Sequence, residues 1–291
     1  MIKIKVFSSF CESQLAIETF IRLNELEKDP DFNKTYSFTL GEDYTHAIIM
    51  NKAMPRLKIP KENVIGLAFE PREFLNITQY FYDYTQRYIG MYFIGNSYGL
   101  GNPFISHCGY MWHTPFNDNL KEKTKKMSLM VSQKKMAPGH LYRHTLAEKI
   151  LSDNLDIDIY GKGCKILSES YPNDKRLKGE FKFQKEMLED YEYHIAIENF
   201  QSPDYFSEKL MDSLICNTKP LYLGCKNHKK YFDDMVIPLM GDIDKDMEII
   251  KEYLKKPREN DIDLKKVKET ISIKNVINLF LNNKQDNVYH K

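Results

Sequence analysis

The sequence predicts an α/β protein with two βα domains, and three observations carry this prediction. Short apolar runs alternate with segments of helical periodicity along most of the 291 residues, as is typical of βα units with largely parallel sheets. A polar, lysine-rich stretch at 117–126, NDNLKEKTKK, interrupts the alternation and has the composition of a connection between domains. The chain is also longer than most single hydrophobic cores support.

The first domain is expected over residues 1–120. An i, i+3, i+4 apolar spacing predicts a helix at 11–27. Strands are predicted for four short runs rich in β-branched and aromatic residues, which lie at 2–7, 46–51, 63–69 and 88–95. The order of these elements favours a sheet whose carboxyl edge can carry a site.

The second domain is expected over residues 127–260. Its predicted strands lie at 127–132, 156–163, 193–198 and 219–224, and its predicted helices at 141–153, 183–192, 207–217 and 246–256. A C-terminal helical segment is expected over 261–291, where 266–283 combines an apolar stripe with several lysines. We expect this segment to pack on the neighbouring domain, with weak contact to a membrane surface as the alternative.

Composition limits the possible function classes. Lys and Arg number 42 against 41 Asp and Glu, so the chain lacks the positive field of a non-specific nucleic-acid binder. Five scattered cysteines without a C-x-x-C pair favour reduced thiols over a disulfide framework or a zinc site. No signal peptide and no membrane-spanning apolar run is recognisable. We therefore expect a soluble, cytoplasmic protein that binds neither nucleic acid nor a metal.

The stretch YHIAIENFQSPDYFSEKLMDSLICNTKPLYLG, residues 193–224, holds most of the candidate site. Four candidate binding residues follow its first strand-like run: Asn199, Tyr205, Glu208 and Lys209. A helix N-terminus beyond a strand end attracts anions, and Lys209 adds a full positive charge for a phosphate. Glu208 can accept hydrogen bonds from two hydroxyls of a ribose or another sugar. Alternatively, Ser207 or Asp204 caps the helix and the charged pair is exposed on the surface.

This stretch resembles the donor-binding signature of family-ten glycosyltransferases, the α-1,3-fucosyltransferases. The residues at the family's spacing are Glu198, Asn199, Tyr205, Ser207, Glu208, Lys209, Thr218, Pro220, Tyr222 and Gly224. Upstream, residues 127–163 resemble the family's strand, loop, arginine-bearing helix and following strand. The resemblance makes Arg143 the counterpart of the family's phosphate-binding arginine, whereas the helix pattern alone indicates a surface ion-pair residue.

The resemblance implies a GT-B-like fold of two facing Rossmann-like domains, with the donor mainly on the second and the acceptor mainly on the first. It implies an inverting transferase that moves L-fucose from GDP-fucose to a glycan hydroxyl. Arg143 and Lys209 would neutralise the departing diphosphate, so that no cofactor is required. Asn199, Tyr205 and Glu208 would together hold phosphate, ribose or fucose. The start of the chain, which lacks an anchor, is similar to soluble bacterial or viral members.

An inverting transfer also needs a carboxylate that takes the proton of the attacking hydroxyl. In IGLAFEPREFL, Glu70 directly follows an apolar run, a position similar to that of the family's catalytic glutamate. Glu73, three residues later, is the rival, and Glu70 could instead belong to a turn that precedes a helix. We predict Glu70 as the base.

Two alternative functions remain open. The chain could transfer a sugar from another nucleotide, or it could be a non-catalytic protein that binds a GDP-sugar or a glycan on the same scaffold. A screen of nucleotide-sugar donors distinguishes a fucosyltransferase from a transferase that uses another nucleotide sugar. Turnover of GDP-fucose distinguishes an enzyme from a non-catalytic binding protein.

Overall fold

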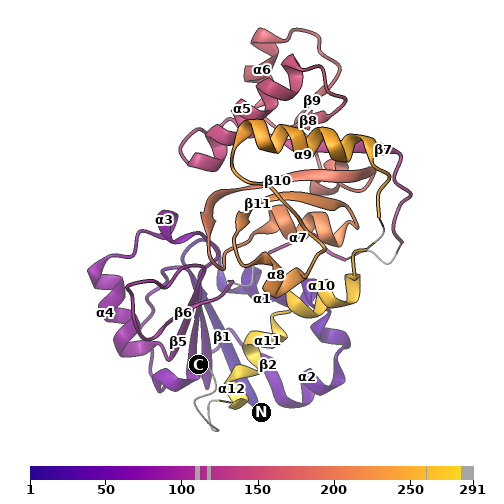
Figure 1. Ribbon diagram of the computed structural model, residues 1–291. Helices are drawn as coiled ribbons and strands as arrows, with labels where there is room; N and C mark the ends of the chain where they lie inside the picture. Colours follow the sequence, from indigo (N-terminus) through magenta and orange to yellow (C-terminus); the bar gives the residue numbers. More distant parts are fainter. Residues whose placement is uncertain (109–111, 117–118, 260, 283–291) are drawn as a thin grey trace. The chain divides into compact units, whose positions relative to one another are not determined.

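The computed structural model describes residues 1–108, 112–116, 119–259 and 261–282 (Figure 1). It divides into two compact units. The first comprises Met1–Trp112, Pro203–Tyr205 and the described part of Thr270–Lys291, and the second comprises His113–Ser202 and Phe206–Glu269. Each unit contains one six-stranded sheet, and every strand pair in both sheets is parallel.

The first sheet has the strand order β2-β1-β3-β4-β5-β6. Its strands are β1 (Ile2–Ser8), β2 (Tyr36–Phe38), β3 (His46–Met50), β4 (Val64–Leu67), β5 (Met91–Ile94) and β6 (Phe104–Ser106). The four predicted strands of this domain are confirmed. The sequence analysis missed β2 and β6, because a three-residue strand is too short to show a period.

Helices and short 3₁₀ turns connect these strands. They are α1 (Ser13–Leu23), η1 (Leu26–Lys28), α2 (Pro30–Thr35), η2 (Lys61–Asn63), α3 (Arg72–Leu75) and α4 (Gln79–Tyr88). The helix predicted at 11–27 is confirmed as α1, and its buried face includes Ala16, Ile17 and Phe20. These side chains join a core cluster with Val6 and Ile48 of the sheet.

The C-terminal segment corrects one expectation. Instead of one helix over 266–283, the chain forms α10 (Leu264–Thr270), α11 (Lys274–Ile277) and α12 (Leu279–Asn282). The side chain of Asn24 accepts a hydrogen bond from the backbone N–H of Ile273 at 2.9 Å, which anchors the chain between α10 and α11.

The apolar residues after this break lie in the core of the first unit. Ile273, Val276, Ile277 and Phe280 are buried there, so these side chains of the predicted stripe face protein rather than solvent. Leu281 remains about half exposed. Membrane contact by 261–291 stays a prediction, and its part at 283–291 lies outside the described residues.

The second sheet has the strand order β12-β11-β10-β7-β8-β9. Its strands are β7 (Lys125–Met130), β8 (Asp158–Tyr160), β9 (Leu177–Gly179), β10 (Tyr191–Ser202), β11 (Lys219–Cys225) and β12 (Ile237–Pro238). If the six strands are numbered from 1 to 6 in chain order, starting with β7, their order from the β9 edge is 3-2-1-4-5-6, as in the Rossmann fold. From β7 the chain first builds the sheet toward β9, and from β10 it builds the sheet in the opposite direction, so the switch point lies between β7 and β10. Open α/β sheets bind ligands beyond the carboxyl ends of the strands at such a switch point.

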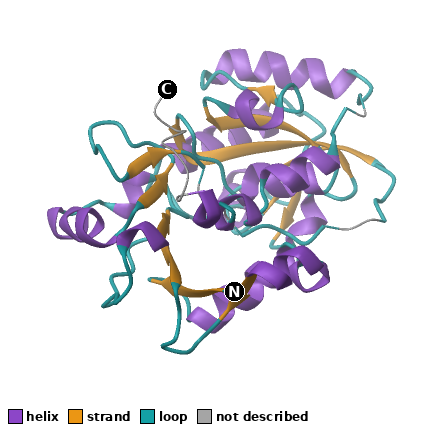
Figure 2. Cartoon of the chain, turned by 90° about the horizontal axis from the view of Figure 1, so that it is seen from below, coloured by secondary structure: helices purple, strands orange, loops and turns teal. Residues whose placement is uncertain are grey.

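The helical elements of the second unit cover this sheet (Figure 2). They are α5 (Pro138–Ser152), α6 (Cys164–Ser170), the 3₁₀ turn η3 (Gln184–Met187), α7 (Glu208–Ile215), α8 (His228–Phe232) and α9 (Ile243–Lys255), with α10 after them. The predicted helices at 141–153, 207–217 and 246–256 are confirmed as α5, α7 and α9. No helix in the described part of the chain has the length and apolar character needed to cross a membrane.

The helix predicted over 183–192 is wrong. Only η3 forms, and Tyr191 begins β10. The hydroxyl of Tyr191 donates to Asp158 at 2.6 Å and lies 2.8 Å from the hydroxyl of Tyr160. These partners belong to β8, so contacts distant in sequence override the local helical pattern.

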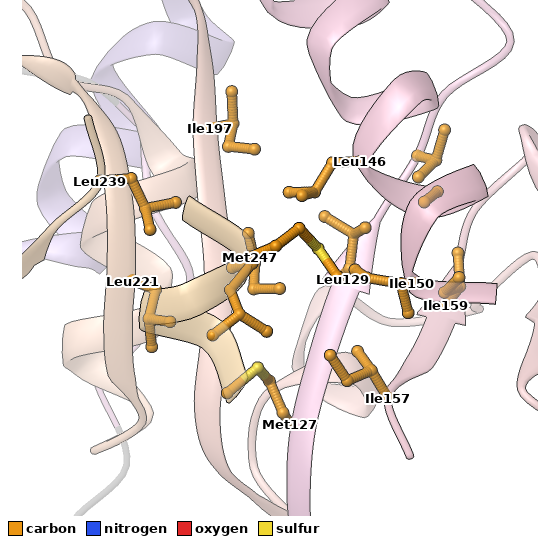
Figure 3. Packing of buried hydrophobic residues seen from close by; sticks show 14 of the residues in the cluster. Met127, Leu129, Leu146, Ile150, Ile157, Ile159, Ile197, Leu221, Leu239 and Met247 are labelled. Atoms are coloured by element: carbon orange, nitrogen blue, oxygen red, sulfur yellow. The ribbon is translucent and has the colours of Figure 1, made fainter. Parts of the chain in front are cut away.

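A continuous apolar core fixes the frame of the second unit. Leu146 and Ile150 of α5 and Met247 of α9 pack against strand residues that include Leu129 and Ile197 (Figure 3). All five side chains are buried. Close packing of this kind holds the ends of β7 and β10, and the helices that follow them, in fixed positions.

Candidate functional site

The site lies where β7 and β10 end and their chains continue into α5 and α7. The first turn of α5 lies directly against the end of β10: a Cβ atom at Gly139 would be 1.8 Å from the carbonyl oxygen of Glu198. Only glycine leaves room for this approach. As a result, the start of α5, which follows β7, lies close to the chain that leaves β10 at one edge of the sheet.

Glu198 is the central buried carboxylate of this edge, with only 2% of its surface exposed. Its Oε1 accepts hydrogen bonds from the Ser207 N–H at 2.8 Å and the Tyr222 hydroxyl at 3.4 Å, and its Oε2 accepts one from the Ser207 hydroxyl at 2.7 Å. A Cβ atom at Gly224 would be 2.4 Å from the Cγ of Glu198. The signature residues Ser207, Tyr222 and Gly224 therefore all serve to seat Glu198.

Ser207 also caps α7, and the two charged candidates follow it. Its hydroxyl oxygen accepts a hydrogen bond from the Lys209 N–H at 3.3 Å. The Lys209 ammonium donates to Glu208 Oε1 at 2.7 Å and lies 3.8 Å from Glu198 Oε2. The Lys209 side chain is 14% exposed and that of Glu208 39%. Ser207 thus caps α7, as the alternative interpretation expected, but the Lys209 side chain is mostly enclosed and is not a solvated surface residue.

Arg143 approaches the same place from α5. Its guanidinium donates to the carbonyl oxygen of Ile197 and, at 2.9 Å, to Oδ1 of Asn199. The side chain is buried, and its Nε–H has no hydrogen-bond partner in the described part of the chain. An unpaired buried donor is costly unless a ligand or water satisfies it. The interpretation of Arg143 as a surface ion-pair residue is therefore wrong.

Charges and burial perturb these groups. Burial raises the pKa of Glu198, against the attraction of Lys209. Burial alone would raise the pKa of Glu208, but Lys209 outweighs it and the pKa is lowered. Burial favours neutral Lys209, yet Glu208 and Glu198 keep its pKa above the ordinary value. Burial lowers the pKa of Arg143 to about 10, so its guanidinium stays charged near neutral pH.

A narrow pocket with room for about one water molecule lies beside this cluster. Arg143, Glu208 and Lys209 line it together with Asp212 and His194. Asp212 is buried and accepts a hydrogen bond from the Thr114 N–H at 2.6 Å, and burial raises its pKa to about 7. Two cations and two carboxylates therefore line this pocket.

The structure thus brings together four of the six predicted site residues: Arg143, Asn199, Glu208 and Lys209. Tyr205 belongs instead to the first unit, where it is buried and its hydroxyl donates to the carbonyl oxygen of Phe69 at 3.4 Å. Its role at the donor site stays a prediction.

Glu70, the sixth, is exposed and lies three residues beyond the end of β4. The turn before it is fixed, since the Asn51 side chain accepts a hydrogen bond from the Phe69 N–H at 2.7 Å. Glu73 lies in α3 and is also exposed. Glu70 is therefore at the carboxyl edge of the first sheet, as predicted, and its role as base stays a prediction.

Sequence reasoning did not assign a role to Glu198 or to Gly139. Glu198 was part of the matched signature, but only the fold shows that it is the buried counter-charge of Lys209. The signal for Gly139 was the Pro-Gly pair at the start of a helix, where a glycine suggests close backbone approach. Among the described residues, no group of three or more His, Cys, Asp or Glu side chains is arranged to hold a metal ion.

Solved structures with a similar fold are all distant in sequence. An α1,3-fucosyltransferase solved with GDP-fucose is 15% identical with a TM-score of 0.55, over 100% of this chain and 92% of that one. A structure of TarM is 12% identical with a TM-score of 0.52, over 82% of this chain and 55% of that one. A DNA-modifying β-glucosyltransferase is 10% identical with a TM-score of 0.50, over 97% and 98%. These similarities confirm the predicted GT-B-like α/β fold.

A family model supplies the evidence from sequence. Residues 120–261 match the C-terminal part of glycosyltransferase family 10 (fucosyltransferase). No curated protein matches the chain. The matched range contains β7, β10, α5 and α7, and therefore all the residues of the charged cluster. The resemblance to glycosyltransferase family 10 is therefore confirmed for residues 120–261.

Proposed function

We propose that the chain is an inverting fucosyltransferase that moves L-fucose from GDP-fucose to a hydroxyl of a glycan. The observation that carries the proposal is the cluster of Arg143, Lys209, Glu208 and Asn199 at the switch point of the second sheet. The family match over residues 120–261 and the GDP-fucose held by a protein of similar fold support this choice of donor.

In this proposal the two cations bind the diphosphate. Lys209 is already enclosed, and Arg143 holds an unpaired Nε–H, so neither needs extensive reorganisation when charge grows on the departing GDP. Donors preorganised in this way stabilise the transition state more than the ground state. Because both charges come from side chains, the scheme does not require a metal ion. Glu208, which is partly exposed, accepts hydrogen bonds from sugar hydroxyls.

Glu70 supplies the base in the same proposal. The acceptor oxygen forms a bond to the anomeric carbon, the bond from that carbon to the GDP oxygen breaks, and the hydroxyl proton passes to the Glu70 carboxylate. Attack opposite the leaving group inverts the configuration. The exposed position of Glu70 beyond β4 allows such contact with an acceptor.

Calorimetry with GDP and UDP, followed by turnover of GDP-fucose against an array of glycans, tests the proposal. We expect GDP to bind at least tenfold more tightly than UDP and fucose to be transferred to one class of acceptor. Preference for UDP would indicate another nucleotide sugar. Binding of GDP without transfer or slow hydrolysis of GDP-fucose would indicate a non-catalytic binding protein.

A further inference from the structure

His140 lies in the first turn of α5 and is not part of the mechanism described so far. It is buried, with 4% of its surface exposed. Its Nδ1 accepts a hydrogen bond from the Ala137 N–H at 3.2 Å, which caps the helix. An Nδ1 that accepts cannot carry a proton, so in the neutral ring the proton is on Nε2.

The Nε2–H of His140 has no partner in the described part of the chain. It is also not one of the fully enclosed atoms without a hydrogen-bond partner, to which Arg143 Nε belongs. The Nε2–H therefore reaches solvent from an otherwise buried ring. Water can satisfy this donor, and a ligand that displaces the water can accept the same hydrogen bond.

The surroundings of His140 select an anion as that ligand. Arg143 lies three residues further along the same helix, so the two side chains share one face, and its Nε–H is likewise unpaired. His140 also lies in the first turn of the 15-residue helix α5, at the positive end of the helix dipole. The open Nε2–H of His140 and the enclosed, unpaired Nε–H of Arg143 thus lie on one face of the first two turns of α5.

We propose that His140 donates a hydrogen bond from Nε2 to the diphosphate of the donor nucleotide, as a neutral ligand beside Arg143 and Lys209. This inference rests on the proposed function, because that function supplies the diphosphate. The Ala137 cap holds the ring in the tautomer that can donate, so His140 is preorganised in the same sense as the two cations.

The electrostatic environment supports a neutral ring in the free protein. Burial is the main cause that lowers the pKa of His140 to about 4, and four groups face the ring and add to it: Arg143 and His144 from α5, Lys134 from the preceding loop, and Lys209 from α7. A further proton could bind only at Nδ1, where it would displace the hydrogen bond from Ala137, so the cap also favours the neutral ring.

Two substitutions separate the cap from the ligand contact. His140→Asn places an amide oxygen near the Nδ1 position and keeps the cap, but it removes the Nε2 donor. His140→Gln places an amide N–H near the Nε2 position and loses the cap. If His140 served only to cap α5, Asn would be the better replacement for both folding and binding.

The test is calorimetric titration of wild type and both variants with GDP, inorganic pyrophosphate and guanosine at pH 7.5. We expect His140→Asn to keep its melting temperature and to bind GDP and pyrophosphate about tenfold more weakly, the loss expected for one charge-assisted hydrogen bond. Guanosine affinity should not change. His140→Gln should melt earlier yet bind GDP within about threefold of wild type.

Titration of GDP at pH 5.5 in two buffers of different ionisation enthalpy adds a second readout. Wild type and His140→Asn should take up the same number of protons, because a ring that keeps its Nδ1 cap stays neutral when the ligand binds. Equal GDP affinity in wild type and His140→Asn would overturn the inference. If the wild-type protein binds pyrophosphate but not GDP, GDP-fucose is not the donor and the proposed function is wrong. The affinity of His140→Asn for pyrophosphate then still tests whether His140 contacts a diphosphate. If the wild-type protein binds neither GDP nor pyrophosphate, both the proposed function and the role of His140 are wrong.

Discussion

Replacement of Lys209 by Met removes a cation that lies between two carboxylates and keeps most of its apolar stem. The ammonium is 2.7 Å from Glu208 Oε1 and 3.8 Å from Glu198 Oε2. Glu208 can turn toward water because its side chain is 39% exposed, whereas that of Glu198 is 1% exposed. The cost of the substitution therefore falls on Glu198.

Two estimates bound that cost. Attraction between unit charges 3.8 Å apart is about 4 kcal/mol at an effective dielectric constant near 20. Glu198 can avoid the full loss by binding a proton, which costs about 1.4 kcal/mol per pH unit above an ordinary glutamate pKa of about 4.3. The ceiling is then about 4 kcal/mol at pH 7.5 and about 1.6 kcal/mol at pH 5.5.

The direction of the pH dependence follows from linkage. Burial raises the pKa of Glu198 in the folded protein, and removal of Lys209 raises it further. Between the unfolded and folded pKa values the folded state holds a proton that the unfolded state has released, so stability falls as pH rises. We expect Lys209→Met to be clearly less stable than wild type at pH 7.5 and to lose less than half as much stability at pH 5.5.

Thermal and denaturant unfolding at the two pH values provide the assay, with two further variants. Lys209→Met combined with Glu198→Gln should recover most of the stability lost at pH 7.5, since no charge is left buried, and should still bind GDP at least tenfold more weakly than wild type. Lys229→Met is the control: Lys229 pairs with Asp234 on the surface, so its loss should leave the stability close to that of wild type at both pH values. Equal destabilisation by Lys209→Met at both pH values would refute the reasoning.

Three further substitutions test the rest of the cluster and the base. Arg143→Lys cannot bridge Ile197 and Asn199 as the guanidinium does, so calorimetry should show GDP affinity reduced at least tenfold; unchanged affinity would remove Arg143 from the site. Gly224→Ala places a Cβ 2.4 Å from Glu198 Cγ and should cost about 1–3 kcal/mol in denaturant unfolding, an expectation that wild-type stability would contradict. Glu70→Gln should slow fucose transfer about 10²-fold with GDP affinity unchanged, whereas Glu73→Gln should stay active, and the reverse result would move the base to Glu73.

Strong local signals made the β10–α7 region predictable. Ser207 before Glu208 is a favourable N-cap followed by an acidic first turn, and an apolar strand precedes them. The resemblance added Arg143, which lies 55 residues before Glu198 in sequence and meets β10 only through the fold. The position of the donor cluster could therefore be predicted, while its internal hydrogen bonds could not.

The errors arose where distant contacts decide the local structure. Residues 183–192 have a helical apolar pattern, but Tyr191 is drawn into β10 by its hydrogen bonds to Asp158 and Tyr160. Likewise, the C-terminal segment breaks where Asn24 binds the Ile273 backbone. In both places a side chain far away in sequence supplies the partner, and periodicity within a short window contains no information about it.

The cluster combines two cations, Arg143 and Lys209, with two carboxylates, Glu198 and Glu208. Glu198 is buried and fixed, whereas Glu208 is partly exposed, and this difference affects how a diphosphate can enter the site. Glu198 is fixed by Ser207 and Tyr222, so it maintains the charge and position of Lys209 whether or not a ligand is bound. Glu208 is partly exposed and holds Lys209 through one oxygen, so it can exchange that contact for sugar hydroxyls while the phosphate takes its place on the ammonium. If Glu198 were the only carboxylate, the positive charge of the enclosed Lys209 would be less fully neutralised before a ligand binds. If both carboxylates were fixed beside Lys209, their negative charges would repel the phosphate.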